Sequence, residues 1–153
     1  MKNIEIERKF LVKGDFVPFA VKKFDIVQGY LCTTADKTVR VRTKGDDAFI
    51  TIKGASNKNG FSHSEFEYSI PFSDAQDILK LCDNLIEKER FIVPFELHNY
   101  EVDVFHGVHE GLIIAELELE SEEEAFEKPE WLGEEVTGDV RYYNAYLATH
   151  TIE

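Results

Sequence analysis

Pairs of like-charged side chains, two positions apart, recur along this chain and could do chemistry. The acidic pairs are Glu5/Glu7, Glu65/Glu67, Glu101/Asp103 and Glu116/Glu118, and the basic pairs are Arg40/Arg42 and Lys88/Arg90. All-oxygen carboxylate sites suit hard cations such as Mg²⁺ or Mn²⁺. Arginine and lysine bind phosphate oxygens. The two kinds of pair together favour a site for a divalent cation and a polyanion.

The spacing of these pairs makes them unfavourable unless something binds them. In a strand, positions i and i+2 lie about 6.7 Å apart. Like charges at that distance repel by roughly 2–3 kcal/mol at an effective dielectric constant near 20. An open sheet with its polar face in water explains any one such strand. It does not explain why whole strands carry mostly one sign of charge. A metal ion bound to the acidic strands and a polyanion bound to the basic strands would offset the repulsion.

Strands must position these side chains, because charged and apolar residues alternate with a period of two. The alternation predicts strands over 3–12, 25–33, 38–44, 47–54, 62–71, 86–94, 98–106 and 112–120. Their short connections favour antiparallel hairpins, and closure into a barrel would remove exposed strand edges. We therefore expect an α+β, mainly antiparallel β protein: an eight-stranded closed, tunnel-like barrel with a charged lumen and a few flanking helices.

Three helical segments are expected beside the strands. Ser73 and Gln76 form a capping-box pattern that predicts a helix over 74–83. Ser121 and Glu124 repeat the pattern for a short turn before Pro129. Apolar residues at helical spacing predict an amphipathic helix over 139–150.

Length and composition limit the function classes. The 153 residues are expected to form one domain, 1–153, and the formal charge of −13 disfavours nucleic acid and anionic membranes as partners. No apolar run approaches the roughly 20 residues of a membrane span, and the N-terminus lacks a signal-peptide pattern. Cys32 and Cys82 stand alone, which is typical of a reduced, cytoplasmic protein.

Most of the negative charge is predicted to lie outside the lumen. The lumen faces carry nine acids and seven bases, a net charge of −2, which leaves −11 for the rest of the chain. Two divalent cations would make this interior positive. The acidic total therefore does not disfavour a metal-bound triphosphate as a small-molecule ligand.

The order of these motifs resembles a known family over nearly the whole chain. Glu5-Ile6-Glu7-Arg8-Lys9 fits the ExExK signature of the CYTH superfamily, the triphosphate tunnel metalloenzymes. The matching motifs downstream are Gln28-Gly29-Tyr30-Leu31, Arg40-x-Arg42, Thr51-x-Lys53, Glu65-x-Glu67, Glu87-Lys88-x-Arg90, Glu101-x-Asp103, Glu116-x-Glu118 and Gly133-Glu134-Glu135-Val136-Thr137 followed by Arg141-Tyr142. The chain is most similar to short bacterial members, which resemble inorganic triphosphatases.

The resemblance implies roles for individual residues. The metal ligands it implies are Glu5, Glu7, Glu116 and Glu118, with Mg²⁺ or Mn²⁺ as cofactor. The phosphate-binding residues are Lys9, Arg40, Arg42, Lys53, Lys88 and Arg90, with Arg141 at one tunnel mouth. For catalysis we expect Lys9 or Lys53 beside the scissile phosphate and Glu116, Glu118 or Glu67 as proton acceptor. The chain departs from larger members because its tail, 139–153, has no lysine and only Arg141 as a strong base.

The expected activity is metal-dependent hydrolysis of inorganic triphosphate to pyrophosphate and phosphate. A class IV adenylyl cyclase, or another nucleoside or organic triphosphatase, is the enzymatic alternative. A polyphosphate or nucleotide sensor is the alternative without turnover, although such a binder would gain nothing from four carboxylates in its pocket. The sequence leaves the oligomeric state open, a homodimer included.

Overall fold

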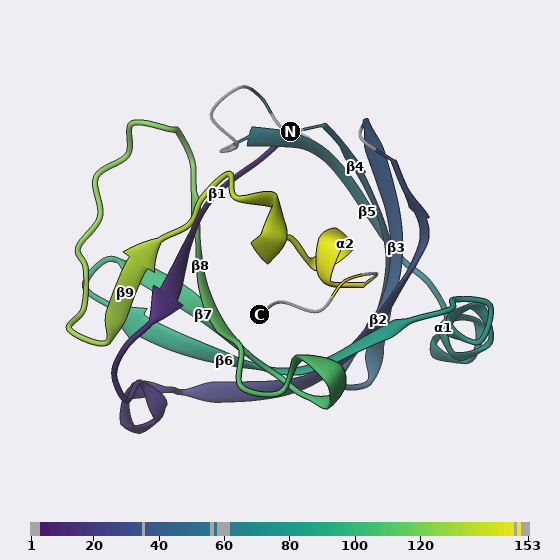
Figure 1. Cartoon of the computed structure of the whole chain (residues 1–153), viewed down its shortest axis with the longest axis horizontal. Coiled ribbons are helices and arrows are strands. Elements are labelled where there is room, and N and C mark those ends of the chain that lie inside the picture. The colour runs from purple at the N-terminus through teal and green to yellow at the C-terminus, as the bar shows by residue number, and fades with distance from the viewer. Residues whose placement is uncertain (1–3, 35, 56, 58–61, 149, 151–153) are drawn as a thin grey trace.

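Eight antiparallel strands close into a barrel in the computed structural model, which describes residues 4–34, 36–55, 57, 62–148 and 150 (Figure 1). The strands are β1 (Ile4–Val12), β2 (Lys22–Thr33), β3 (Lys37–Lys44), β4 (Asp47–Gly54), β5 (Ser62–Ser69), β6 (Leu85–Phe95), β7 (His98–Phe105) and β8 (Ile113–Leu119). They follow the order β5-β4-β3-β2-β6-β7-β8-β1, and pairing of β5 with β1 completes the ring. The predicted eight-stranded antiparallel barrel is confirmed.

A ninth strand that the alternation did not predict lies beside β1. This strand, β9 (Leu132–Glu135), pairs with the second half of β1, whereas β5 pairs with the first half. It is only four residues long, too short for a period-two pattern to identify it.

The helices differ from the predicted ones. The helix α1 covers Phe72–Leu79 rather than 74–83, and its N-cap is Pro71, not Ser73. The segment after Ser121 forms turns without a helix. The tail helix predicted over 139–150 is divided into η3 (Val140–Tyr142) and α2 (Asn144–Leu147), because Tyr143 between them is extended. Two further short 3₁₀ helices are η1 (Val17–Phe19) and η2 (Gly107–His109).

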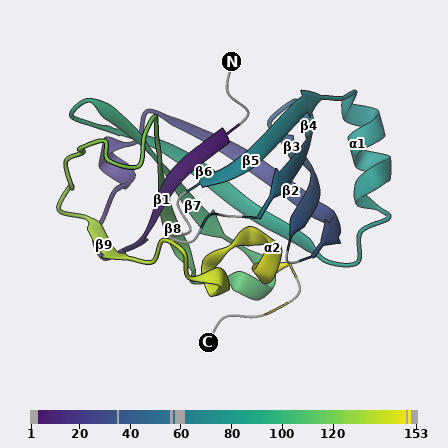
Figure 2. The same ribbon diagram turned by 90° about the horizontal axis from the view of Figure 1, so that it is seen from above.

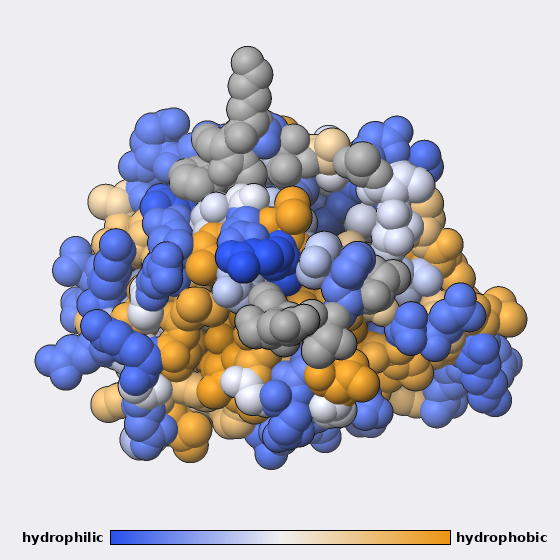
Figure 3. Space-filling view, in the orientation of Figure 1, coloured by the Kyte–Doolittle hydropathy of each residue, from blue (hydrophilic) through white to orange (hydrophobic). Residues whose placement is uncertain are grey.

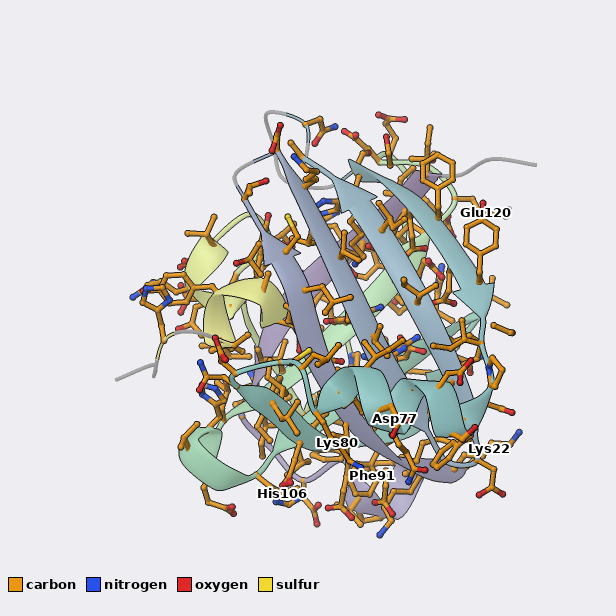
Figure 4. All side chains as sticks on the ribbon, turned by 90° about the vertical axis from the view of Figure 1, so that its right-hand side faces the viewer. Lys22, Asp77, Lys80, Phe91, His106 and Glu120 are labelled. Atoms are coloured by element: carbon orange, nitrogen blue, oxygen red, sulfur yellow. The ribbon has the colours of Figure 1, made fainter. Side chains whose placement is uncertain are left out.

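The apolar faces of the strands turn outward and are covered there. Phe10 and Leu117 are buried in a cluster that includes Phe16 of the segment before η1 and Trp131 of the segment before β9. Across the molecule, α1 lies against the outside of the barrel (Figure 4) and buries Ala75 and Leu79 against β3 and β4. Apolar side chains thus stabilise the barrel from outside, which leaves its interior for charged ones.

The C-terminal segment occupies one end of the barrel. Figures 1 and 2 show α2 within this end, and Figure 3 shows that the same face carries apolar as well as hydrophilic side chains. Leu147 and Ala148 pack on Ile86, Phe105 and Ile114, whose side chains share the inward faces of β6, β7 and β8 with charged residues. The interior therefore has an apolar end, sealed by α2, and a charged remainder.

Two other observations concern the chain as a whole. Cys32 and Cys82 are both free. No helix among the described residues is long and apolar enough to cross a membrane.

Candidate active site

A cavity of about 440 Å³ lies inside the barrel and is lined mainly by charged side chains. Its acids are Glu5, Glu7, Glu65, Glu67, Glu101, Glu116 and Glu118, and its bases are Lys9, Lys37, Arg40, Arg42, Lys44, Lys53 and Arg90. Tyr30, Thr51, His63, Tyr143 and Asn144 are among its uncharged lining residues. A cavity of this size and polarity suits a small, highly charged ligand better than an apolar one.

The acids gather where β1 meets its two neighbours, β5 and β8. We call Glu5, Glu7, His63, Glu65 and Glu118 the Glu5 cluster. The antiparallel register places Glu5 opposite His63 and Glu7 opposite Glu118. One ligand atom each from Glu5, Glu7 and His63 lie within 4.8 Å of one another, and the same holds for Glu5, Glu65 and Glu118.

Two lysines partly compensate the charge of these acids. Lys53 Nζ lies 2.6 Å from Glu5 Oε1 and 3.9 Å from Glu65 Oε2. Lys9 Nζ lies 3.5 Å from Glu116 Oε2 and 3.9 Å from Glu7 Oε1. Lys9 also faces the C-terminal segment, with its Nζ 5.0 Å from the centre of the Tyr143 ring.

The compensation is incomplete, and the pKa values show where. Burial, together with the nearby charge of Glu116, raises the pKa of Glu7 to about 8. Burial and the charge of Glu5 likewise raise the pKa of Glu65 to about 7. Burial opposes ionisation of Glu116 too, but the charges of Lys9 and Arg90 outweigh it and lower that pKa to about 2. Carboxyls whose pKa values are raised, as those of Glu7 and Glu65 are, lack nearby positive charge, so the Glu5 cluster fits a divalent cation.

Arg40 and Arg42 form a basic surface on β3, beside the acids. A terminal nitrogen of Arg42 lies 3.4 Å from Glu67 Oε2, and one of Arg40 lies 3.9 Å from the same oxygen. Thr51 donates a 2.8 Å hydrogen bond to that carboxylate. Burial and the charge of Arg40 lower the pKa of Arg42 to about 10. Because two guanidinium groups share one carboxylate, this surface attracts a further anion.

A third group of charges lies on β6 and β7, and its members satisfy one another. We call Lys88, Arg90 and Asp103 the Asp103 cluster. Arg90 binds Asp103 through two hydrogen bonds of 2.7 and 2.9 Å, and Lys88 Nζ lies 2.8 Å from Asp103 Oδ2. Lys88 also donates a 2.9 Å hydrogen bond to Asn144 Oδ1 of α2. The side chain of Lys88 is fully buried and does not line the cavity.

The structure brings most of the predicted site residues to the cavity. Ten of them line it: Glu5, Glu7, Lys9, Arg40, Arg42, Lys53, Glu67, Arg90, Glu116 and Glu118. Lys88 lies behind the wall. Arg141 is not brought to the cavity, because its guanidinium binds Asp139 at 2.7 Å and the side chain is 59% exposed.

The lining residues that were not predicted include His63, Tyr143 and Asn144. His63 precedes Glu65 by two positions, so the period-two pattern itself places it on the inward face of β5. Burial and the charge of Lys53 lower the pKa of the His63 ring. No local pattern could have revealed Tyr143 and Asn144, because they reach the cavity only through the placement of the C-terminal segment.

Comparisons with known proteins agree with this geometry. The model of the CYTH domain family matches residues 3–150. The chain is 48% identical over 145 residues to an inorganic triphosphatase of Acetivibrio thermocellus, which covers 94% of this chain and 92% of the relative. It is 36% identical over 149 residues to an inorganic triphosphatase of Nitrosomonas europaea, covering 94% and 96%. A crystal structure of an inorganic triphosphatase matches with a TM-score of 0.70 and 34% identity, over 97% of each chain.

Proposed function

The chain belongs to the CYTH domain family, and on this premise we propose that it hydrolyses inorganic triphosphate to pyrophosphate and phosphate with a divalent metal ion. Two curated relatives that match nearly the whole chain are inorganic triphosphatases. The observation that carries the proposal is the cavity, in which a carboxylate-rich region and a basic surface face the same space.

The carboxylates are the part of the cavity that would hold the metal. We assign Glu5, Glu7, Glu116 and Glu118 as ligands for Mg²⁺ or Mn²⁺, since carboxylate oxygens suit both ions. When bound, such an ion neutralises charge on the phosphate oxygens and lowers the pKa of a bound water. The raised pKa of Glu7 supports the assignment, because added positive charge would relieve it.

The basic side chains are assigned to the triphosphate. Arg40 and Arg42 bind the non-bridging oxygens in pairs, as the planar guanidinium favours. Lys53 and Lys9 lie beside the carboxylates Glu5 and Glu7, so we assign them to the oxygens around the scissile bond. Arg90 lines the cavity from β6, which only β2 separates from β3, and adds further positive charge.

Hydrolysis then needs positioning more than covalent help from the protein. A water oxygen forms a bond to the terminal phosphorus, the bond from this phosphorus to the bridging oxygen breaks, and pyrophosphate leaves. The proton of the water passes to a carboxylate. Glu116 is ionised throughout the neutral range and orients the water by accepting its hydrogen bond. The alternative acceptors are Glu118 on the same strand, β8, and Glu67 on β5.

The proposal is tested by phosphate release from triphosphate, long-chain polyphosphate, ATP and thiamine triphosphate, with Mg²⁺, Mn²⁺ or a chelator. We expect triphosphate to be the best substrate and the chelator to abolish turnover. Glu7→Gln should lower kcat/KM by about 100-fold or more, whereas Glu123→Gln, on an exposed turn, should leave it unchanged.

Three outcomes would contradict the proposal. Hydrolysis that survives the chelator, or that Glu7→Gln leaves unchanged, would remove the metal assignment. Cyclic AMP formation from ATP without phosphate release would identify a cyclase. Tight triphosphate binding with no metal-stimulated turnover would identify a sensor.

A further inference from the structure

His63 places an imidazole among the carboxylates of the Glu5 cluster. Its Cα is paired with that of Glu5 across the β1–β5 ladder that closes the barrel. One ring nitrogen lies within 4.8 Å of ligand oxygens of both Glu5 and Glu7, while those oxygens lie equally close to each other. Three donors at such mutual distances can contact one ion.

The surroundings of the ring fix its orientation. It makes an edge-to-face contact with Tyr143, with ring centres 6.0 Å apart and planes inclined by 68°. The backbone of Gly54 also lies beside the ring and acts to raise its pKa, against the lowering by burial. Metal-binding histidines typically donate one ring N–H to a carbonyl oxygen, which leaves the lone pair of the other nitrogen for the metal.

The lysines near this trio leave room for a further cation. Lys53 contacts Glu5 through Oε1, and Lys9 contacts Glu7 through Oε1 at 3.9 Å. Each carboxylate has a second oxygen that can bind a metal while the first keeps its lysine. Glu7 is only 6% exposed, so its charge is poorly hydrated by bulk water.

The second trio, Glu5, Glu65 and Glu118, has only oxygen donors. Oxygen-only sites suit Mg²⁺ and Mn²⁺ alike, whereas an imidazole nitrogen favours transition ions over Mg²⁺. The two trios share Glu5 but differ in ligand chemistry, and His63 makes that difference.

We propose that His63 is a metal ligand in this chain, and that with Glu5 and Glu7 it forms a site that prefers a transition ion such as Mn²⁺ to Mg²⁺. The proposal rests on the metal dependence of the proposed function. It adds a nitrogen donor to the carboxylate ligand set.

Pulsed electron paramagnetic resonance of Mn²⁺ bound to the chelator-treated full chain tests the assignment directly. A coordinated imidazole gives a ¹⁴N coupling, which becomes a ¹⁵N coupling when histidine is ¹⁵N-labelled. We expect this coupling in the unaltered chain and in His98→Gln, whose histidine pairs with Glu124 outside the cavity. We expect His63→Gln to lose it, with Mn²⁺ affinity lowered roughly tenfold and Mg²⁺ affinity nearly unchanged.

The outcomes separate this inference from the proposed function. Bound Mn²⁺ without nitrogen coupling, in an enzyme that still needs metal to hydrolyse triphosphate, would overturn the His63 assignment alone. Retention of the coupling in His63→Gln would overturn it too. Nitrogen coupling without metal-stimulated hydrolysis would support the ligand and overturn the function. The isotope shift in the unaltered chain gives a decision even where a variant fails to fold.

Discussion

The Glu5 cluster and the Asp103 cluster lie in the same barrel and both consist of ionisable side chains, yet their charges balance differently. In the Asp103 cluster one carboxylate meets two cations, all at 2.7–2.9 Å. In the Glu5 cluster four carboxylates have only Lys53 and Lys9 nearby. Lys53 lies 2.6 Å from Glu5 but 3.9 Å from Glu65, and Lys9 lies 3.9 Å from Glu7.

The pKa values express the same difference. Burial opposes ionisation of Asp103, but Arg90 and Lys88 outweigh it and lower the pKa of this carboxyl well below its ordinary range. Burial dominates at Glu7 and raises its pKa to about 8. The Asp103 cluster is therefore complete within the protein, whereas the Glu5 cluster needs a cation from solution. A cluster whose charges balance within the protein stabilises the barrel wall, whereas a cluster with excess negative charge can bind a cation.

The largest effect on stability is expected from Asp103→Ala. The substitution leaves Lys88 and Arg90 buried without their carboxylate, and breaking such a buried pair typically costs about 3–5 kcal/mol. Urea unfolding should show this loss, while Asp77→Ala on the exposed side of α1 (Figure 4) should leave the free energy of unfolding nearly unchanged. A loss below about 1 kcal/mol would mean that the Asp103 cluster does not support the fold.

In the metal-free protein Glu7→Gln should raise the free energy of unfolding, whereas Asp103→Ala lowers it. The folded pKa of Glu7, about 8, exceeds its ordinary value of 4.5. Its contribution to stability is therefore present below pH 4.5 and is lost as the pH rises towards 8. Glutamine is neutral at every pH, so the variant should become more stable than the parent as the pH rises from 5 to 8. The difference in free energy of unfolding should reach about 1 kcal/mol or more at pH 8.

Urea unfolding at several pH values with a chelator present measures this difference. Glu123→Gln is the matched control and should follow the parent at every pH. If the free energy of unfolding of Glu7→Gln and of the parent depends on pH in the same way, the pKa of Glu7 is no more raised than that of a surface carboxyl.

The sequence was sufficient to predict the barrel and most of its lining because both depend on the period-two pattern. Once strands pair antiparallel, Lys9 must lie opposite Glu116 and Glu7 opposite Glu118 or its neighbours. The same rule places His63 inside the barrel, although His63 belongs to none of the acidic or basic pairs. Alternation thus fixes which face a side chain occupies.

The pattern could not predict how deep along the barrel a side chain lies or what closes the barrel's end. Lys88 and Arg90 share one face, yet only Arg90 reaches the cavity, since Lys88 is covered by Asn144 of α2. The tail bends at Tyr143 to enter the barrel, so the continuous helix predicted over 139–150 does not form. Such placements depend on contacts between distant segments, which local spacing does not encode.

A smaller effect is expected from Asn144→Ala, which removes the hydrogen bond that Lys88 donates to Asn144. A hydrogen bond to a charged group contributes roughly 1.5–3 kcal/mol, and Asp103 remains, so the loss should be about 1–2 kcal/mol. Asn144→Asp keeps an acceptor and should retain stability, while Asn99→Ala, at an exposed position near the start of β7, serves as control. An equal loss in the alanine and aspartate variants would assign the effect to packing of α2 rather than to Lys88.

The smallest effect is expected from Arg141→Ala, because Arg141 belongs to neither cluster. Its guanidinium binds Asp139 in solvent, where salt screens its charge beyond about 10 Å. The kcat/KM for triphosphate should therefore stay within roughly twofold of the parent, while Arg42→Ala should lower it by about tenfold or more. A loss at Arg141 as large as that at Arg42 would show that the substrate reaches the C-terminal segment. The substrate site would then extend past Tyr143 to Arg141, and the end of the barrel would not be closed to the substrate.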